Sequence, residues 1–270
     1  MPKIHANGID IYYEVHGPTE AMPLVLIAGI GYDHWVWHKM VPGFAQNFQV
    51  ITFDNRGVGQ TEKPPGPYTA QMLAADTAGL MRGLQIPKAA VLGHSMGGFV
   101  AQALALDYAE MVDKLILAAT SFGGPHHIPV TPEAMAVLKD TTLDPVERFK
   151  RGIAVSTAPG FAESHPEIIQ EWVTHTIQNP IQPAAYQAQY AVGDKLFEPE
   201  ACFEGKLREI DAPTLILFGE HDQVMPPGNA ELLANEIQNS QIVILPNAGH
   251  FFPFETPEAA VQAVTDFLLA

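Results

Sequence analysis

The sequence is poor in cysteine and in long apolar runs. Cys202 is its one cysteine, so no disulfide can form within the chain, which is typical of proteins in a reducing compartment. No apolar run approaches the roughly 20 residues of a membrane-spanning helix, and the N-terminus lacks the apolar segment of a signal peptide. We therefore expect a soluble protein of the cytoplasm.

Basic residues are also scarce. Fourteen lysines and arginines stand against 30 aspartates and glutamates, which gives a formal net charge of -16. An acidic surface repels nucleic acid and anionic membranes, so we expect neither as a partner and favour a neutral small-molecule substrate. A role of the acidity in solubility or salt tolerance alone is an equally good explanation. A homodimer is kept as an open alternative for the assembly.

Short apolar runs alternate with helix-like segments along most of the chain. Asn7-Gly8 predicts a hairpin between the first residues and the strand-like residues 9–16. Apolar runs typical of strands buried on both faces follow at 23–28, 49–53, 89–92, 115–119, 214–218 and 241–245. Repeated strand-helix-strand units predict a mostly parallel sheet with helices on both faces, and ligands bind at the carboxyl ends of such strands.

The pattern changes between residues 122 and 208. There the chain consists of helix-like pieces interrupted by prolines, with no convincing buried strand. We interpret 122–208 as a helical cap inserted into one core domain, which is formed by residues 1–121 and 209–270. A last helix is predicted to begin at Thr256-Pro257-Glu258, with the threonine as its cap.

Residues 93–97, Gly-His-Ser-Met-Gly, join a predicted strand to a predicted helix. Glycines two residues before and after Ser95 allow the sharp turn that exposes a nucleophilic serine at the end of a strand. The same pentapeptide also occurs as a plain turn. A catalytic serine needs an imidazole to accept its proton and a carboxylate to orient that imidazole, so the rest of the chain decides between the two interpretations.

Two polar loops supply the missing groups. Asp222 and His250 follow consecutive predicted strands, and both would therefore lie at the same sheet edge as Ser95. The order serine, acid, histidine is that of the α/β-hydrolase arrangement. Glu220 is the nearest substitute for Asp222. The alternative to a catalytic role is that Asp222 is only a turn residue. His94 is expected to pack near the turn, and His221 to be solvated.

Four motifs resemble those of the α/β-hydrolase superfamily, and specifically its small capped esterase, lactonase and cofactor-free haloperoxidase group, over essentially the whole chain. They are residues 28–31, residues 54–59, residues 93–98, and the pair 219–222 with 249–250. The resemblance implies an eight-stranded, mostly parallel sheet, an oxyanion hole formed by the backbone amides of Ile30 and Met96, and catalysis without a cofactor. Ala28 replaces the usual histidine of the family, which removes a side chain that organises this loop.

Other side chains have structural as well as functional interpretations. Arg56 is expected to brace loops rather than bind a carboxylate, and Trp37 to lie in the core. The histidines of the cap lack the spacing and acidic partners of a zinc site, so no metal is expected. The residues that are candidates for the walls of a substrate pocket are Gly29, Trp35, Phe122, Phe161, Trp172, Tyr186 and Phe251.

The sequence thus predicts a serine carboxylester hydrolase that cleaves small to medium neutral esters through an acyl-enzyme on Ser95. A lactonase of the 3-oxoadipate enol-lactone type is the alternative enzyme, although it would need a cation to hold a substrate carboxylate. Perhydrolase or haloperoxidase-like activity would be a side reaction of the same acyl-enzyme. An alternative of another class is a ligand receptor or signalling partner that uses a hydrolase pocket.

Overall fold

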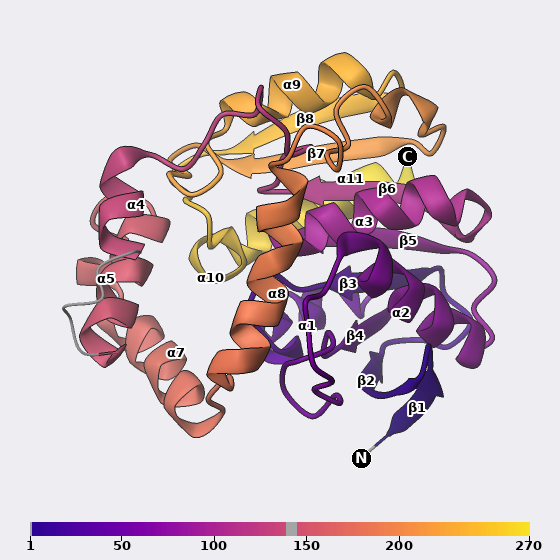
Figure 1. Cartoon of the computed structure of the whole chain (residues 1–270), viewed down its shortest axis with the longest axis horizontal. Helices are drawn as coiled ribbons and strands as arrows, with labels where there is room; N and C mark the ends of the chain where they lie inside the picture. The colour runs from indigo at the N-terminus through magenta and orange to yellow at the C-terminus, as the bar shows by residue number, and fades with distance from the viewer. Residues whose placement is uncertain (1, 139–144) are drawn as a thin grey trace.

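Eight strands form one sheet in the order β1-β2-β4-β3-β5-β6-β7-β8. The structure is a computed structural model that describes residues 2–138 and 145–270 (Figure 1). The strands are β1 Lys3–Ala6, β2 Ile9–His16, β3 Pro23–Ile27, β4 Gln49–Phe53, β5 Ala89–His94, β6 Val112–Ala118, β7 Thr214–Gly219 and β8 Ser240–Leu245. Each apolar run that predicts a buried strand therefore forms one.

The sheet is mostly parallel, as predicted. β1 pairs with β2 and β2 with β4 in antiparallel fashion, whereas every pairing from β4 to β8 is parallel. Asn7 and Gly8 form the turn of the first hairpin with φ of 49° and 78°. These left-handed values explain why asparagine and glycine occupy the turn.

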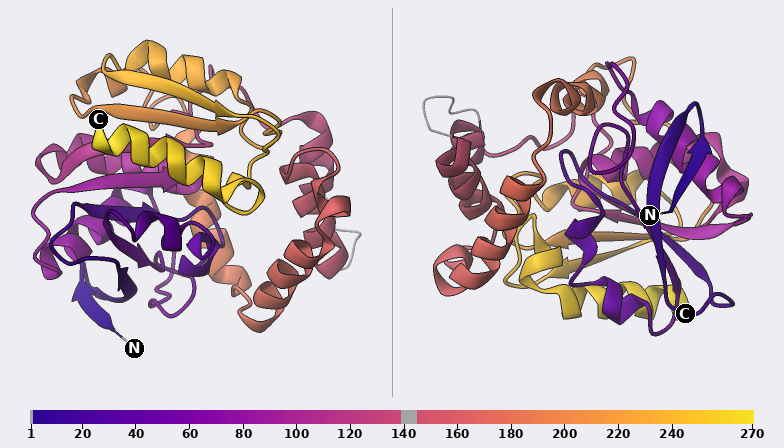
Figure 2. Two further views of the ribbon diagram at one scale, coloured as in Figure 1. Left: turned by 180° about the vertical axis from the view of Figure 1, so that it is seen from behind. Right: turned by 90° about the horizontal axis from the view of Figure 1, so that it is seen from below.

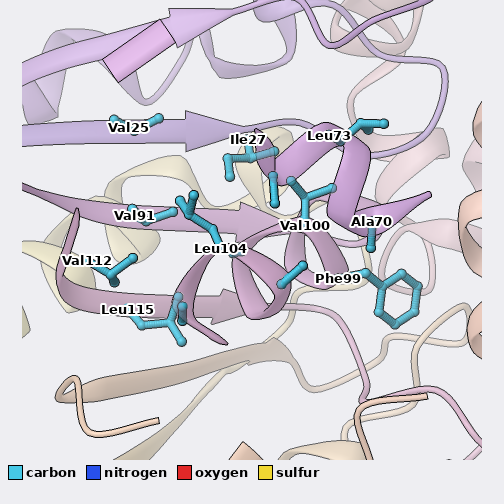
Figure 3. Packing of buried hydrophobic residues seen from close by; sticks show 14 of the residues in the cluster. Val25, Ile27, Ala70, Leu73, Val91, Phe99, Val100, Leu104, Val112 and Leu115 are labelled. Atoms are coloured by element: carbon cyan, nitrogen blue, oxygen red, sulfur yellow. The ribbon is translucent and has the colours of Figure 1, made fainter. Parts of the chain in front are cut away.

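Helices cover both faces of the sheet (Figures 1 and 2). One face carries α2 Ala70–Gly83, α3 Met96–Asp107 and α9 Gly228–Glu236, and the other carries α1 Val41–Phe44, α10 Phe252–Glu255 and α11 Pro257–Leu269. Figure 3 shows Val100 and Leu104 of α3 against Val91 of β5, inside a buried apolar cluster. Helix α3 is buried almost all round, so burial fixes the helix that begins directly after Ser95.

Five α-helices of the described residues lie between β6 and β7. They are α4 Pro132–Leu138, α5 Pro145–Ser156, α6 Phe161–Ser164, α7 Pro166–Gln178 and α8 Pro183–Leu196, and we call them the cap helices. Figures 1 and 2 show them at the end of the sheet toward which the parallel strands point. The described part of residues 122–208 contains no strand, and three short 3-10 helices complete the described elements: η1 His34–Trp37, η2 Ala109–Met111 and η3 Leu207–Glu209. None of the described helices combines the length and apolarity that a membrane crossing requires.

The last helix begins at Pro257 as predicted, but the prediction that Thr256 caps it is wrong. Thr256 has φ -139° and ψ 53° and makes no side-chain cap hydrogen bond. Thr69, at the start of α2, has φ -129° and ψ 160°, and its hydroxyl accepts a hydrogen bond from the Met72 amide. An extended ψ directs the cap side chain toward the free amides of the first turn, and Thr256 lacks that conformation.

Candidate active site

Ser95 lies at the turn between β5 and α3. Its φ of 56° and ψ of -120° are unusual for a residue with a side chain, which indicates local backbone strain. A side chain at Gly93 would clash with the Gly97 carbonyl, and one at Gly97 would clash with the Ile27 carbonyl. The two glycines therefore permit the close approach of strand and helix that produces this turn, as the sequence pattern predicts.

Asp222 and His250 meet at the ends of β7 and β8. The His250 Nδ1 atom lies 2.8 Å from Asp222 Oδ2, and both side chains are buried. Asp222 Oδ1 accepts hydrogen bonds of 2.8 Å from the amides of Val224 and Met225. Because these bonds fix the carboxylate and Nδ1 faces it, Nε2 is the His250 nitrogen available for proton transfer.

The competing acid and histidines have other surroundings. The Glu220 carboxylate accepts a hydrogen bond of 3.2 Å from the Asn247 amide and is about half exposed, and His221 lies 3.7 Å from it. His94 is buried and donates from Nε2 to the His250 carbonyl oxygen at 2.8 Å. Burial, together with the neighbouring His250, lowers the pKa of His94 to about 3, so His94 is a neutral donor that supports the His250 backbone.

Glu255 ties the His250 loop to the end of cap helix α5. Its carboxylate accepts hydrogen bonds from the amides of Gly249, at 3.0 Å, and Ala158, at 2.6 Å. The His250 amide donates to the Ser156 carbonyl oxygen at 2.7 Å. Burial raises the pKa of Glu255 to about 7, despite the amides that donate to its charged form. The histidine loop is thus held by the cap as well as by the core.

Of the two residues predicted to form the oxyanion hole, Met96 directly follows Ser95, and Ile30 follows a glycine that lies against it. Met96 is the first residue of α3, where the backbone amide has no partner within the helix. Ile30 lies in the loop after β3, and a Cβ atom on the preceding Gly29 would be 3.2 Å from Ser95 Cβ. The next two amides of the loop are occupied, because Gly31 donates to the Gln189 side chain at 2.8 Å and Tyr32 to the Gly29 carbonyl at 3.4 Å.

The loop is organised without the usual histidine at position 28. Asn55 Nδ2 donates to the Ala28 carbonyl oxygen at 3.1 Å, and Gln189 holds the loop at Gly31 from α8. These two side chains brace the loop from the segment that follows β4 and from the cap. The structure therefore shows how the loop keeps its position although Ala28 carries no polar group.

Four of the predicted pocket residues lie around this site. The Phe251 ring follows His250 at a centroid distance of 5.3 Å and packs edge-on against Trp172 at 4.3 Å. A Cβ atom on Gly31 would lie 3.4 Å from the Tyr186 ring, and Gly29 lies against Ser95 as described. Tyr32 joins the group with ring centroids 5.4 Å from Phe251. Burial raises the pKa of Tyr32, so its hydroxyl stays neutral.

The other three predicted pocket residues pack elsewhere among the described residues. Trp35 is stacked between His38 and His175, with both centroid distances 4.1 Å. Phe161 stacks on His165 at 4.5 Å. Phe122 belongs to the buried cluster around α3. Trp35 thus lies at the junction of α7 with η1, Phe161 in α6, and Phe122 in the core. Their part in a substrate pocket stays a prediction.

Sequence reasoning missed Tyr32, Gln189 and Glu255. Tyr32 directly follows the glycine-rich loop, and that position was a usable signal. Gln189 falls on the apolar face of α8 that also carries Ala185, Ala188 and Val192, where a glutamine interrupts the pattern. Glu255 carried no signal, because its partners are amides that only the fold brings near.

Arg56 braces loops, as expected. Its Nε and Nη2 atoms donate to the two carboxylate oxygens of Asp76 at 2.5 Å, and both residues are buried. The guanidinium is thus already bound by a carboxylate. Burial raises the pKa of Asp76 even though Arg56 opposes that shift; the bidentate geometry favours the charged pair.

The fold agrees with comparison to known proteins. The model of the alpha/beta hydrolase fold family matches residues 22–257, and the chain belongs to this family. "Putative non-heme bromoperoxidase BpoC" of Mycobacterium tuberculosis (strain ATCC 25618 / H37Rv) is 32% identical over 96% of this chain and 97% of its own length. The enol-lactonase of Burkholderia xenovorans LB400 is 26% identical with a TM-score of 0.84, and 100% of each chain is covered. A thermophilic esterase from Thermogutta terrifontis is 28% identical with a TM-score of 0.80, covering 99% of this chain and 98% of the other.

Proposed function

We propose that this hydrolase is a serine carboxylester hydrolase that acts on small to medium neutral esters. The observation that carries the proposal is the buried pair of His250 and Asp222, 2.8 Å apart, at the sheet edge where Ser95 occupies a strained strand-to-helix turn. These three residues come from the ends of β7, β8 and β5, so the convergence is a property of the fold rather than of one motif.

The reaction follows from the roles that this geometry supports. His250 Nε2 accepts the Ser95 hydroxyl proton while Oγ attacks the ester carbonyl carbon. The amides of Ile30 and Met96 stabilise the oxyanion, and one such donor is worth about 3 to 4 kcal/mol of barrier. The protonated His250 then gives its proton to the leaving alcohol. Water hydrolyses the acyl-enzyme by the same steps in reverse, and no cofactor takes part.

The surroundings of the site favour a neutral substrate. Tyr32, Trp172 and Phe251 supply apolar surface beside His250. Arg56 lies in the loop after β4, and its buried guanidinium is bound to Asp76. A substrate carboxylate would therefore lack the cationic partner that Arg56 would otherwise provide.

A lactonase is the second candidate, and the relatives favour it. "3-oxoadipate enol-lactonase 2" of Acinetobacter baylyi is 27% identical over 98% of this chain, beside the enol-lactonase structure described above. A lactone is an intramolecular ester and undergoes the same attack by serine. The engaged state of Arg56 supports an uncharged lactone rather than a carboxylated one. Perhydrolysis would follow if hydrogen peroxide replaced water at the acyl-enzyme.

Turnover of p-nitrophenyl esters tests the proposal. We expect many turnovers per protein molecule, with Ser95→Ala lowering the rate by about 10⁴ or more and Ser164→Ala, a cap serine, serving as the matched control. Unchanged turnover in Ser95→Ala would overturn the site assignment. Tight binding with about one turnover per site would favour the receptor alternative. A chain-length panel of acyl esters and uncharged lactones at fixed salt then ranks the two enzyme candidates.

A further inference from the structure

Gln189 is a fully buried polar side chain that the reaction scheme does not use. It lies on the face of α8 that packs toward the core, beside Ala185, Ala188 and Val192. Its Oε1 atom accepts a hydrogen bond of 2.8 Å from the Gly31 amide, and its Nε2 atom donates to the Arg56 carbonyl oxygen at 2.9 Å. Burial of a side-chain amide costs free energy unless it is hydrogen-bonded. Both hydrogen-bond partners of Gln189 are backbone groups.

The two partners of Gln189 belong to different core loops. Gly31 lies in the loop after β3 that carries the Ile30 amide, and Arg56 lies in the loop after β4. Asn55, next to Arg56, donates to the Ala28 carbonyl oxygen at 3.1 Å. The loop with Ile30 is therefore held on both sides of that residue, by Asn55 at position 28 and by Gln189 at position 31.

The two side-chain contacts flank the Gly29-Ile30 peptide, which carries the Ile30 amide. Gly31 has φ of 78°, a conformation that few residues other than glycine adopt, and the Gln189 oxygen binds the amide of that residue. A peptide amide stabilises an oxyanion only if it points to the position where the charge develops. A shift of Gly31 that broke this bond would also displace the adjoining Gly29-Ile30 peptide, which carries the Ile30 amide.

We propose that Gln189 is a positioning residue of the oxyanion hole, carried by the cap rather than by the core. This inference rests on the proposed function, because it assigns Gln189 to the same ester cleavage. Its consequence is that α8 must be seated on the core for the Ile30 amide to be oriented. The cap then contributes to bond cleavage as well as to the choice of substrate.

The test compares three variants with the wild type on one p-nitrophenyl ester. Gln189→Met keeps the size of the side chain and removes both hydrogen bonds. Gln189→Glu keeps an acceptor for Gly31 but opposes the Arg56 carbonyl. Gln187→Met replaces an exposed glutamine of the same helix and is the matched control. For each protein kcat, KM, Tm and the rate of Ser95 labelling by a p-nitrophenyl alkylphosphonate are measured, since the phosphonyl oxygen also uses the oxyanion hole.

We expect Gln189→Met to lower kcat and the labelling rate by about 10 to 100-fold with KM changed less than about threefold, and Gln189→Glu to fall between it and the wild type. A residue that only stabilises the cap would lower Tm without this split. The inference is overturned if the wild type turns over the ester through Ser95 and Gln189→Met matches Gln187→Met, or changes KM alone. If the wild type shows no turnover that depends on Ser95, the proposed function itself is overturned, and the inference with it.

Discussion

The core loops and the cap helices hold the candidate site in different ways. In the core, Asp222 is fixed by the amides of Val224 and Met225, and Ser95 by its own backbone conformation. From the cap side, one contact is a single side chain, Gln189 on the Gly31 amide, and another is the Ser156 carbonyl oxygen on the His250 amide. Both regions reach the reacting groups, but only the core does so mainly through turns whose geometry is encoded locally.

This difference separates two kinds of change. A turn that needs glycine at positions 93 and 97 tolerates almost no substitution, because any side chain would meet a backbone carbonyl. A contact made by one side chain on a helix can be replaced when that helix changes. We infer that the turn at Ser95 is the more constrained of the two, whereas a cap contact such as that of Gln189 can be replaced in a chain with another cap helix.

After Ser95→Ala, the largest effect expected within the core comes from Asp222→Asn. The asparagine has nearly the same size, but it cannot stabilise the protonated His250 and favours the wrong tautomer, so kcat should fall by roughly 10³ to 10⁴ with little change in KM. Steady-state kinetics on a p-nitrophenyl ester checks this. Glu220→Gln is the matched control, since its carboxylate binds the Asn247 amide instead. A larger loss in Glu220→Gln would show that the core acid is misassigned.

The sequence predicts the core far better than the cap contacts. Strand runs, the turn at Ser95 and the loops with Asp222 and His250 follow from local patterns, and the structure places each at the expected sheet edge. The predicted threonine cap of α11 failed because the conformation of Thr256 depends on the preceding helix α10, which no local rule includes.

The cap was harder to predict for a physical reason. Its aromatic residues serve both its own packing and the site, and periodicity does not distinguish these uses. Trp172 contacts Phe251 beside His250, whereas Phe161 stacks on His165 between α6 and α7. The fold brings the Ala158 amide, which is distant in sequence, to the Glu255 carboxylate. The sequence pattern gives no sign of the burial that raises the pKa of Glu255.

A smaller effect, on stability, is expected from Glu255, which links the His250 loop to the segment after cap helix α5. Its folded pKa of about 7 exceeds the ordinary 4.5, so the folded protein binds a proton more tightly than the unfolded chain. The stability from this proton is complete below about pH 4.5 and is lost as the pH rises through 7. Glu255→Gln removes the titration. The free energy of unfolding of the variant should therefore gain on that of the wild type by up to roughly 3 kcal/mol between pH 4.5 and 8.

Urea unfolding at several pH values in this window measures the gain. Glu258→Gln, in the exposed first turn of α11, is the matched control. A difference between Glu255→Gln and the wild type that stays constant with pH would mean that the pKa of Glu255 is the same in the folded protein as in the unfolded chain. The link between the His250 loop and α5 would then be an ordinary ion-to-amide contact.

The smallest expected effect concerns the contact of α7 with η1. His175 Nε2 lies 3.0 Å from Asp33 Oδ2. Burial alone would raise the pKa of Asp33, but the contact with His175 outweighs burial, and the pKa is lowered. Asp33→Asn should cost about 1 kcal/mol, or roughly 2 °C in Tm, because the pair is largely buried. Arg151→Gln breaks an exposed pair with Glu147 inside one cap helix and should cost less than half as much. If Asp33→Asn costs no more than Arg151→Gln in thermal unfolding, the contact between His175 and Asp33 does not hold the cap on the core, and the contacts of Gln189 and Glu255 carry that role.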